Sequence, residues 1–207
     1  NEAFLGAMNH CKQNNSALHL VGLVSDGGVH SHITHLIKLV EMANLNNIEK
    51  VYIHFISDGR DTLVDSGVGF VAELENAIKG KAVISDIVGR VYAMDREKRY
   101  DRLKKAYDLF VNGVAENAAN SATEALKQSY ASGVFDEFIE PVIIDKNGKK
   151  IGFYACAEHE FSIADQFNPG ANPYDPLNTF DDIFELKKKC DYLVVLYHGG
   201  KEFYNYV

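Results

Sequence analysis

Short apolar runs alternate with helical patterns along the first part of the chain, and this alternation constrains the fold more than any other feature. The apolar runs are bounded by turn-forming residues, which is typical of buried strands, and they lie at 18–24, 51–56 and 83–88. The segments with apolar residues at helical spacing are 31–45, 71–78, 100–111 and 122–131. Strands that alternate with helices favour parallel βαβ units. We therefore expect an α/β fold with three layers, in which helices cover both faces of a mostly parallel sheet.

The last part of the chain has a different pattern. We expect strands at 150–156 and 192–197, a loop rich in Asn, Pro and Gly at 168–178, and a helix at 180–190. The polar, turn-forming stretch 145–150 is the best candidate boundary, although an ordinary hairpin turn would have the same composition. We expect one part at 1–145 and a second at 146–207, with the second packed onto the same sheet.

Charge and cysteine content exclude several classes of protein. The formal net charge is -8, which disfavours nucleic-acid binding, because neutralising phosphates requires clustered Lys and Arg. The three cysteines are widely spaced and form no CxxC motif, as expected of reduced thiols. No apolar run approaches the roughly 18 residues of a membrane span, and the first residues do not resemble a signal peptide. We expect a cytoplasmic protein with no nucleic-acid or membrane partner, and we expect both ends of the chain to be cut.

A stretch rich in polar and glycine residues follows each of the first three predicted strands. These are SDGGVHSH at 25–32, SDGRD at 57–61 and GRVYAMDR at 89–96. In open parallel sheets, ligands bind beyond the carboxyl ends of the strands. The three loops are therefore predicted to converge at one edge of the sheet.

The residue types in these loops suit an anion. Glycine lets backbone N–H groups approach a ligand, the start of the following helix carries partial positive charge, and arginine donates to phosphate or carboxylate in pairs. Aspartate and histidine could hold or deprotonate a hydroxyl group. The predicted site, for a small and doubly anionic substrate, consists of the phosphate-loop glycines Gly27 and Gly28 with His30, Arg60, Asp61, Arg90 and Arg96.

Each of these residues also has a purely structural interpretation. Two glycines before a helix can form only a tight turn, and Ser31 and His32 can simply cap that helix. Asp61 can be an Asx-turn residue. Arg99 and Arg102 fall on a predicted helix with charges of both signs, which looks like a solvated face. The case for a site depends on the joint placement of Arg60, Arg90 and Arg96.

These loops also carry a family resemblance. LHLVGLVSDGGVHSH, VYIHFISDGRD, VGRVYAMDREKRYDR, AYDLFVNG and SYASGVFDEFIEPVI resemble, in this order, the phosphotransferase (substrate-binding) domain of cofactor-independent phosphoglycerate mutases, from about residue 1 to 144. That family interconverts 3- and 2-phosphoglycerate in glycolysis. The resemblance implies that phosphoglycerate, or phosphate, binds at His30, Arg60, Asp61, Arg90 and Arg96.

The resemblance also implies what these residues lack. In the family, the phosphoryl group passes through a serine on a separate domain that holds two divalent metals, typically manganese. The family also continues into a stretch with an arginine pair, and nothing like it follows Ile144. We therefore expect no catalytic nucleophile, no metal and no cofactor in this chain, and no turnover by the chain alone.

The end of the chain resembles another family. From about residue 149, KIGFYACAEHEFSIA and the stretch that ends in DYLVVLYHGGKEFYNY resemble the C-terminal part of poly-glutamate capsule-synthesis proteins, which have a metallophosphatase-like fold. There the resemblance makes His198, with Glu202 nearby, a candidate metal ligand, although catalytic metal sites usually need three protein ligands. We therefore favour a chimera or fusion of two partial domains. A recombined or engineered scaffold without activity and a metal-dependent phosphoesterase centred on His198 are the alternatives.

Overall fold

The computed structural model describes residues 2–144, 151–157, 179–188 and 192–198. The chain divides into two compact units, residues 1–148 and residues 149–207, and each is described by itself. The predicted loop at 168–178 and Glu202 lie outside the described residues.

The first unit is built on a five-stranded mixed sheet with the strand order β1-β2-β3-β5-β4. The three predicted strands are present as β1 (Leu18–Leu23), β2 (Val51–Ser57) and β3 (Val83–Gly89), and they pair in parallel. The sequence did not predict the other two, β4 (Asn117–Ala118) and β5 (Val142–Ile143). β5 pairs with β3 in antiparallel orientation and with β4 in parallel. The predicted α/β class, with a mostly parallel sheet, is confirmed.

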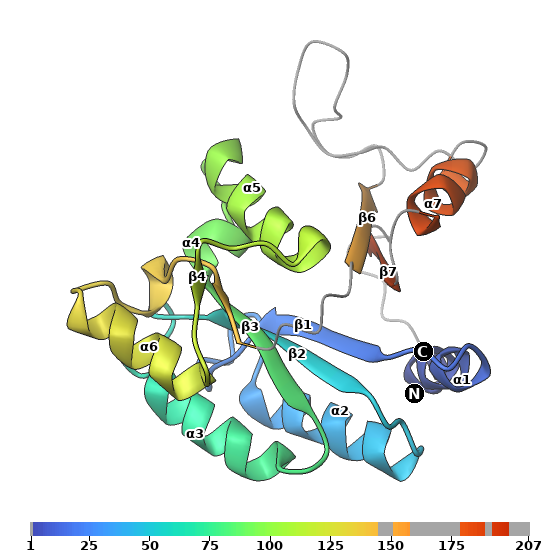
Figure 1. The fold of residues 1–207 in the computed structure, drawn as a ribbon, viewed down its shortest axis with the longest axis horizontal. Helices are drawn as coiled ribbons and strands as arrows, with labels where there is room; N and C mark the ends of the chain where they lie inside the picture. The colour runs from blue at the N-terminus through green and yellow to red at the C-terminus, as the bar shows by residue number, and fades with distance from the viewer. Residues whose placement is uncertain (1, 145–150, 158–178, 189–191, 199–207) are drawn as a thin grey trace. The chain divides into compact units, whose positions relative to one another are not determined.

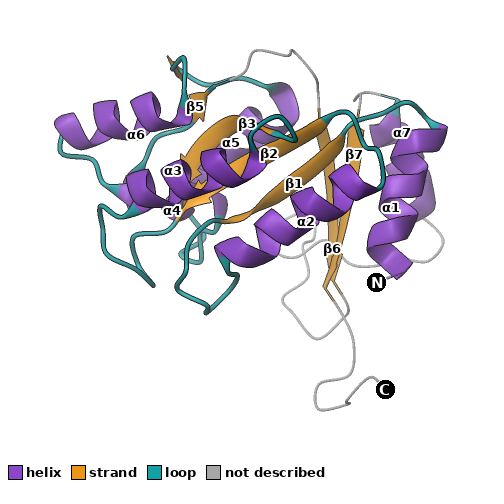
Figure 2. Ribbon diagram, turned by 90° about the horizontal axis from the view of Figure 1, so that it is seen from below, coloured by secondary structure: helices purple, strands orange, loops and turns teal. Residues whose placement is uncertain are grey.

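Helices cover both faces of this sheet (Figures 1 and 2). The described helices of the unit are α1 (Glu2–Gln13), α2 (Ile33–Leu45), α3 (Gly67–Ile78), α4 (Arg90–Ala93), α5 (Tyr100–Tyr107) and α6 (Ala122–Ala131), with a π-helical turn η1 (Asp108–Asn112) and a 3-10 turn η2 (Asp136–Phe138). α2, α3 and α6 lie on one face, and α4 and α5 lie on the other (Figure 1). None of the helices in the described part of the chain is long and apolar enough to cross a membrane.

The main core lies between the sheet and α2, α3 and α6. Phe55 of β2 is fully buried and belongs to one cluster with Val40 of α2, Leu74 of α3 and Leu126 of α6. Burying side chains of this size stabilises the fold by about 1.5–3 kcal/mol each, which fixes the sheet and the loops at its ends. The unpredicted helix α1 adds Met8 and Cys11 to a second cluster beside the first residues of β2.

A line of polar side chains crosses the three parallel strands on the sheet face opposite the main core. Nδ1 of His19 lies 2.9 Å from Nε2 of His54, and Nδ1 of His54 lies 2.6 Å from a carboxylate oxygen of Asp86. The Phe110 ring meets His54 edge-on. Burial, together with the neighbouring His54, lowers the pKa of His19 to about 3, so His19 is neutral at physiological pH.

In the second unit the structure describes two strands and one helix. β6 (Ile151–Ala157) and β7 (Tyr192–His198) pair in parallel, and α7 (Thr179–Lys187) precedes β7. The two strands form a two-stranded sheet. The expectation that this part packs onto the larger sheet stays a prediction.

Candidate anion-binding site

The loops that follow β1, β2 and β3 lie at the same edge of the sheet. The three strands are adjacent and parallel, and their last residues are in register, with Leu23 opposite Ile56 and Ser57 opposite Gly89. The loop after β3 immediately becomes α4, which begins at Arg90. The strand pairing therefore brings the three polar stretches together.

One buried carboxylate, that of Asp58, connects all three loops. It accepts hydrogen bonds from the Ser25 hydroxyl at 2.6 Å, from Nη1 of Arg90 at 2.6 Å, and from the backbone N–H groups of Arg60 and Asp61 at 3.2 and 3.0 Å. Burial raises the pKa of Asp58, but these hydrogen bonds outweigh burial and the net pKa is lowered. The carboxylate is therefore ionised at neutral pH. The Asx turn in this loop is formed by Asp58, and Asp61 has a different role.

Asp61 contacts the cationic side of the site. Its carboxylate accepts from Nη1 of Arg90 at 2.7 Å and lies 3.9 Å from Nε2 of His30. Arg90 is 6% exposed, and although burial lowers its pKa, the bonds to Asp61 and Asp58 raise it above the usual value. The imidazole of His30 is half exposed, so His30 and Asp61 both have a side open to a ligand.

The glycines of the first loop allow close approach to Asp61. A Cβ on Gly27 would lie 3.0 Å from the Cβ of Asp61 and 3.1 Å from its carbonyl oxygen. Gly28 has a φ of 72°, in the left-handed region that favours glycine. The N–H of Gly27 already donates to the Ser25 hydroxyl at 3.3 Å. Gly27 is therefore needed for the packing of this loop against Asp61.

α2 begins two residues after the predicted start at residue 31, and the interpretation of His32 as its cap is confirmed. The helix begins at Ile33, and its N-cap is His32, whose Nδ1 accepts from the N–H of Thr34 at 3.3 Å. The N–H of Ile33 donates to the carbonyl of Ser25 at 2.7 Å. These first amides have acceptors within the protein, so α2 offers an anion its dipole rather than these N–H groups.

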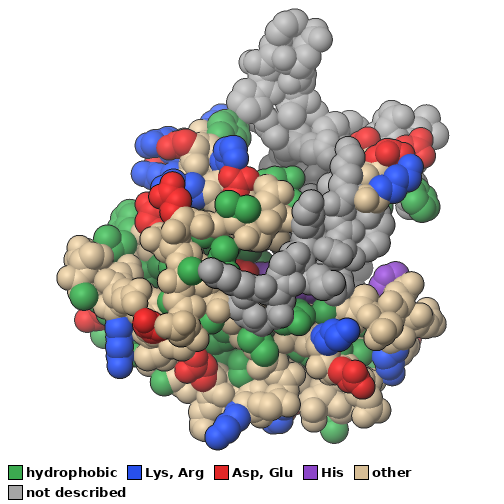
Figure 3. Space-filling view, in the orientation of Figure 1, with side chains coloured by type: hydrophobic (Ala, Val, Ile, Leu, Met, Phe, Trp, Pro, Cys, Tyr) green, Lys and Arg blue, Asp and Glu red, His purple; other side chains and the backbone are tan. Residues whose placement is uncertain are grey.

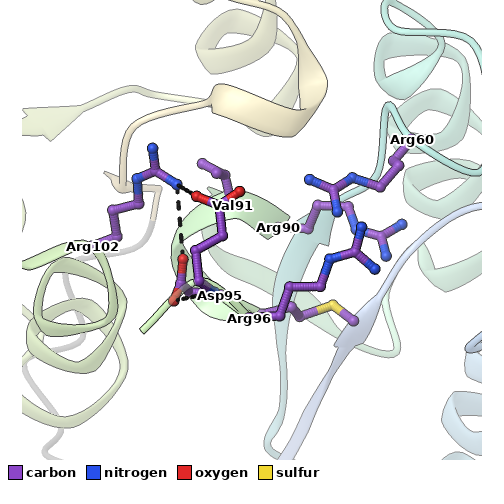
Figure 4. A pocket seen from close by; sticks show the side chains of 8 residues that line it. Arg60, Arg90, Val91, Asp95, Arg96 and Arg102 are labelled. Carbon is purple, nitrogen blue, oxygen red and sulfur yellow. Dashed lines mark hydrogen bonds and ion pairs between the residues drawn. The ribbon is translucent and has the colours of Figure 1, made fainter. Parts of the chain in front are cut away.

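Arginines dominate the hollow at this edge. Its lining is Arg60, Arg90, Val91, Met94, Asp95, Arg96, Glu97 and Arg102 (Figure 4). The side chains of Arg60, Arg90 and Arg96 approach one another there, and Arg102 lies on the other side of α4 (Figure 4). The predicted grouping of these three arginines therefore agrees with the geometry.

The four arginines differ in how they are paired. Arg90 has Asp58 and Asp61, while Arg60 donates to a carboxylate oxygen of Glu137, with Nε at 3.0 Å and Nη2 also in contact. Arg102 pairs with Glu97 at 3.1 Å and lies 3.8 Å from Asp95. Arg96 has no hydrogen bond or ion pair with any residue that the structure describes. Its guanidinium is free to meet an incoming anion.

Three residues that sequence reasoning passed over take part in this arrangement. Arg102 was assigned to a solvated face, but it lines the hollow. Lys, Arg, Asp and Glu side chains do gather on the outer surface over α5 (Figure 3), where Arg99 pairs with Asp101. Asp58 was visible as part of SDGRD, and its position two residues before Arg60 is the Asx-turn signal that would have found it. Glu137 gave no such signal.

No described residues form a metal site. No group of three or more His, Cys, Asp or Glu side chains that could hold a metal ion occurs among them. The family resemblance places its two divalent metals on a separate domain, and the expectation of no metal in this chain stays a prediction. The sequence candidate His198 is the last residue of β7, and its side chain lies outside what the structure describes.

The arrangement suits binding and orientation of a small anion. Arg96, which has no partner in the described part of the chain, and two arginines held by carboxylates provide donors for two anionic groups. Asp61 and His30 provide an acceptor and an imidazole for hydroxyl groups between them.

Comparison with known proteins finds a family whose profile matches most of this chain. A family profile described as "BPG-independent PGAM N-terminus" matches residues 1–158. This match extends past residue 144, where the sequence resemblance was expected to end, and includes β6.

Two similar proteins, both called 2,3-bisphosphoglycerate-independent phosphoglycerate mutase, come from Acetivibrio thermocellus and Lachnoclostridium phytofermentans. The first is 48% identical over 80% of this chain and 32% of its own length, and the second is 50% identical over 73% and 30%. A crystal structure of Leishmania mexicana phosphoglycerate mutase, at low cobalt concentration, matches with a TM-score of 0.65 and 28% identity over 72% of this chain and 29% of that one. The chain thus spans about a third of the length of these relatives.

Proposed function

The chain belongs to the family of BPG-independent phosphoglycerate mutases, and on this premise we propose that residues 1–144 bind phosphoglycerate at the edge of the sheet where β1, β2 and β3 end. The observation that carries the proposal is the hollow lined by Arg60, Arg90 and Arg96, in which Arg96 has no partner among the described residues. Phosphoglycerate has a phosphate and a carboxylate separated by a short carbon chain with a hydroxyl group. Three convergent guanidinium groups match that charge pattern.

Each residue has a distinct role in this proposal. Arg96 and Arg60 bind the anionic groups, and Arg90 binds while also holding the loops together through Asp58. Asp61 accepts a hydrogen bond from a substrate hydroxyl, and His30, 3.9 Å from Asp61, contacts the glycerate from the other side. The site thus holds the glycerate in place while its phosphoryl group is exchanged, and such positioning is a large part of catalysis in phosphoryl transfer.

We propose that the chain alone does not complete that transfer. The family resemblance assigns the serine nucleophile and two divalent metals to a separate domain. A coupled assay of purified chain with 3-phosphoglycerate should therefore show no formation of 2-phosphoglycerate. We also propose that the protein acts in the cytoplasm.

We further propose that the part after residue 145 is a segment of different origin, related to capsule-synthesis proteins. The division of the chain into two compact units after Gly148 lies close to the boundary that this proposal requires, whereas the family profile continues to residue 158. The proposal predicts that a protease site inserted at 145–148 can be cut without changing the affinity of residues 1–144 for 3-phosphoglycerate.

The direct test is calorimetric titration of 3-phosphoglycerate into the chain and into Arg96→Ala, at low ionic strength. A hydrogen bond to a charged group contributes about 1.5–3 kcal/mol, so the variant should bind about 10- to 100-fold more weakly. Its thermal stability should be unchanged, because Arg96 is exposed and pairs with none of the residues that the structure describes.

Arg99→Ala is the matched control. Arg99 also carries an exposed guanidinium, but it pairs with Asp101 on the outer surface. It should bind 3-phosphoglycerate as the wild type does. Equal affinity of Arg96→Ala and wild type would refute the site, and a wild-type chain that binds no 3-phosphoglycerate at millimolar concentration would refute the proposed function.

A further inference from the structure

Arg60 is held in place by a residue far away in the sequence. Its Nε and Nη2 both donate to one carboxylate oxygen of Glu137, which is 77 positions further along the chain. The Glu137 side chain is 15% exposed and that of Arg60 is 35% exposed, so the carboxylate is the more buried partner. Only one edge of the guanidinium is used in this contact. Nη1 and the second N–H of Nη2 remain available to a ligand.

The turn that carries Glu137 is itself firmly anchored. Asp136 is fully buried, and its carboxylate accepts from the N–H of Gly67 at 2.7 Å and from the Tyr130 hydroxyl. Its carbonyl accepts from the Ser57 hydroxyl at 2.7 Å, and its N–H donates to the carbonyl of Val64 at 2.9 Å. The turn is therefore bonded to the end of β2 and to both sides of the loop that carries Arg60.

Three glycines make room for this turn. A Cβ on Gly59 would lie 2.8 Å from the Cβ of Asp136, and one on Gly67 would lie 2.5 Å from its carboxylate oxygen. A Cβ on Gly89 would lie 2.4 Å from the carbonyl oxygen of Glu137. Real Cβ atoms do not approach other atoms this closely. The absence of a side chain at these three positions therefore lets η2 and the Asp136 side chain pack closely against the loop after β2, the start of α3 and the end of β3.

We infer that Glu137 is a positioning residue of the anion site, which holds the guanidinium of Arg60 with its free edge directed to the substrate. The inference rests on the proposed function, since it assigns a role in phosphoglycerate binding. A long arginine side chain loses considerable rotamer entropy when a ligand immobilises it. Glu137 immobilises Arg60 before the ligand arrives, so this entropy loss does not reduce the affinity for the ligand. The anchored turn supplies the rigidity that such a role requires.

The opposite role would give the opposite result. If the Glu137 carboxylate occupied the edge of Arg60 that the ligand needs, removing it would strengthen binding. The contact at Nε and Nη2 argues against competition, because the Nη1 side lies away from Glu137 and can still bind an anion. The sign of the affinity change therefore decides between the two roles.

The experiment is a double-mutant cycle on the full chain with Glu137→Ala, Arg60→Ala and the double variant, titrated with 3-phosphoglycerate. We expect Glu137→Ala to bind at least tenfold more weakly than wild type. In the Arg60→Ala background, the same change should have no further effect, because the group that Glu137 positions is gone. Glu137→Gln keeps one acceptor oxygen and should recover part of the affinity.

A second readout separates positioning from general damage. The Nε–Hε signal of Arg60 in the ligand-free protein should be sharp and shifted in wild type, and should move to the position of a solvent-exposed arginine in Glu137→Ala. Asp101→Ala is the matched control, since Asp101 binds Nε and Nη2 of Arg99 on the exposed surface. It should change the Arg99 signal and leave both the Arg60 signal and the affinity unchanged.

The outcomes distinguish the two proposals. If wild type binds 3-phosphoglycerate and Glu137→Ala binds equally well or more tightly, the positioning role is wrong and the proposed function stands. The same holds if Glu137→Ala weakens binding equally in the presence and absence of Arg60. If wild type does not bind, the proposed function fails and the positioning role falls with it.

Discussion

The buried carboxylate of Asp58 offers the sharpest test of how the site is held together. Asp58→Ala removes one acceptor that serves the Ser25 hydroxyl, Nη1 of Arg90 and two backbone N–H groups. Arg90 is 6% exposed and would keep only Asp61 as a partner. Removing one member of a buried ion pair destabilises a protein by about 3–5 kcal/mol. Because Asp61 remains as a partner of Arg90, we expect Asp58→Ala to lower the free energy of unfolding by about 3 kcal/mol.

Asp58→Asn separates the charge from the hydrogen bonds. The amide oxygen can still accept from the two backbone N–H groups at 3.0 and 3.2 Å, and the Ser25 hydroxyl can reverse to accept from the new NH₂ group. Only the charge opposite Arg90 is lost. We expect Asp58→Asn to lower the free energy of unfolding by about 1–2 kcal/mol, in the range of a hydrogen bond to a charged group.

The assay is urea unfolding at pH 7 without ligand, followed by far-UV circular dichroism and by the fluorescence of the tyrosines. The slope of the free energy of unfolding against urea concentration should be equal in all variants, so that differences between their unfolding midpoints report differences in stability. Asp101→Asn removes a charge from an exposed pair and should stay within about 0.5 kcal/mol of wild type. An Asp58→Ala protein as stable as Asp101→Asn would refute the view that Asp58 holds the three loops together.

Two further predictions concern the sheet and its edge. The pKa of His19 is about 3 in the folded protein against 6.5 in the unfolded chain, so the unfolded state takes up a proton first as pH falls. Below pH 6.5 the free energy of unfolding should therefore decrease with falling pH, by about 1.4 kcal/mol per pH unit more in wild type than in His19→Asn. Equal slopes for the two proteins, from urea unfolding at pH 7 to 5, would contradict this. Gly89→Ala should lower the free energy of unfolding by about 1–3 kcal/mol and weaken 3-phosphoglycerate binding, because the new Cβ would meet backbone atoms of residues 137 and 139. Gly22→Ala is the control, since a Cβ on Gly22 would meet nothing within 4 Å. Thermal melts in which Gly22→Ala is the less stable variant would contradict the packing argument.

The parts of the fold that are coded locally could be predicted from the sequence. The apolar runs that became β1, β2 and β3 are each short and bounded by turn residues, and the helix at 122–131 matches α6 (Ala122–Ala131) at both ends. The strand-end loops then followed from the parallel pairing of those strands. By contrast, β4 and β5 have only two residues each, which is too short to produce a period in the sequence. α1 buries only Met8 and Cys11 among its described residues, so its apolar face is too sparse to recognise.

The cations of the site were predictable and their partners were not. Arg60, Arg90 and Arg96 each follow a strand, and the direction of the chain places them at one edge. Glu137 reaches Arg60 only through tertiary packing across 77 positions, so no local spacing indicates it. Arg102 was misassigned because its helix carries acidic and basic residues together, and only the position of α5 shows that one of them faces the hollow.

The most direct test of the central claim is a titration of 3-phosphoglycerate into ¹⁵N-labelled chain, followed by the amide and arginine side-chain signals. We expect saturable shifts at the residues that the ends of β1, β2 and β3 bring to one edge, which are Gly28, His30, Asp61, Arg90 and Arg96. Amides on the opposite edge of the sheet, such as those at the start of β2, should not move. Shifts confined to exposed lysines, or no shifts at millimolar ligand, would contradict the claim that this edge binds phosphoglycerate.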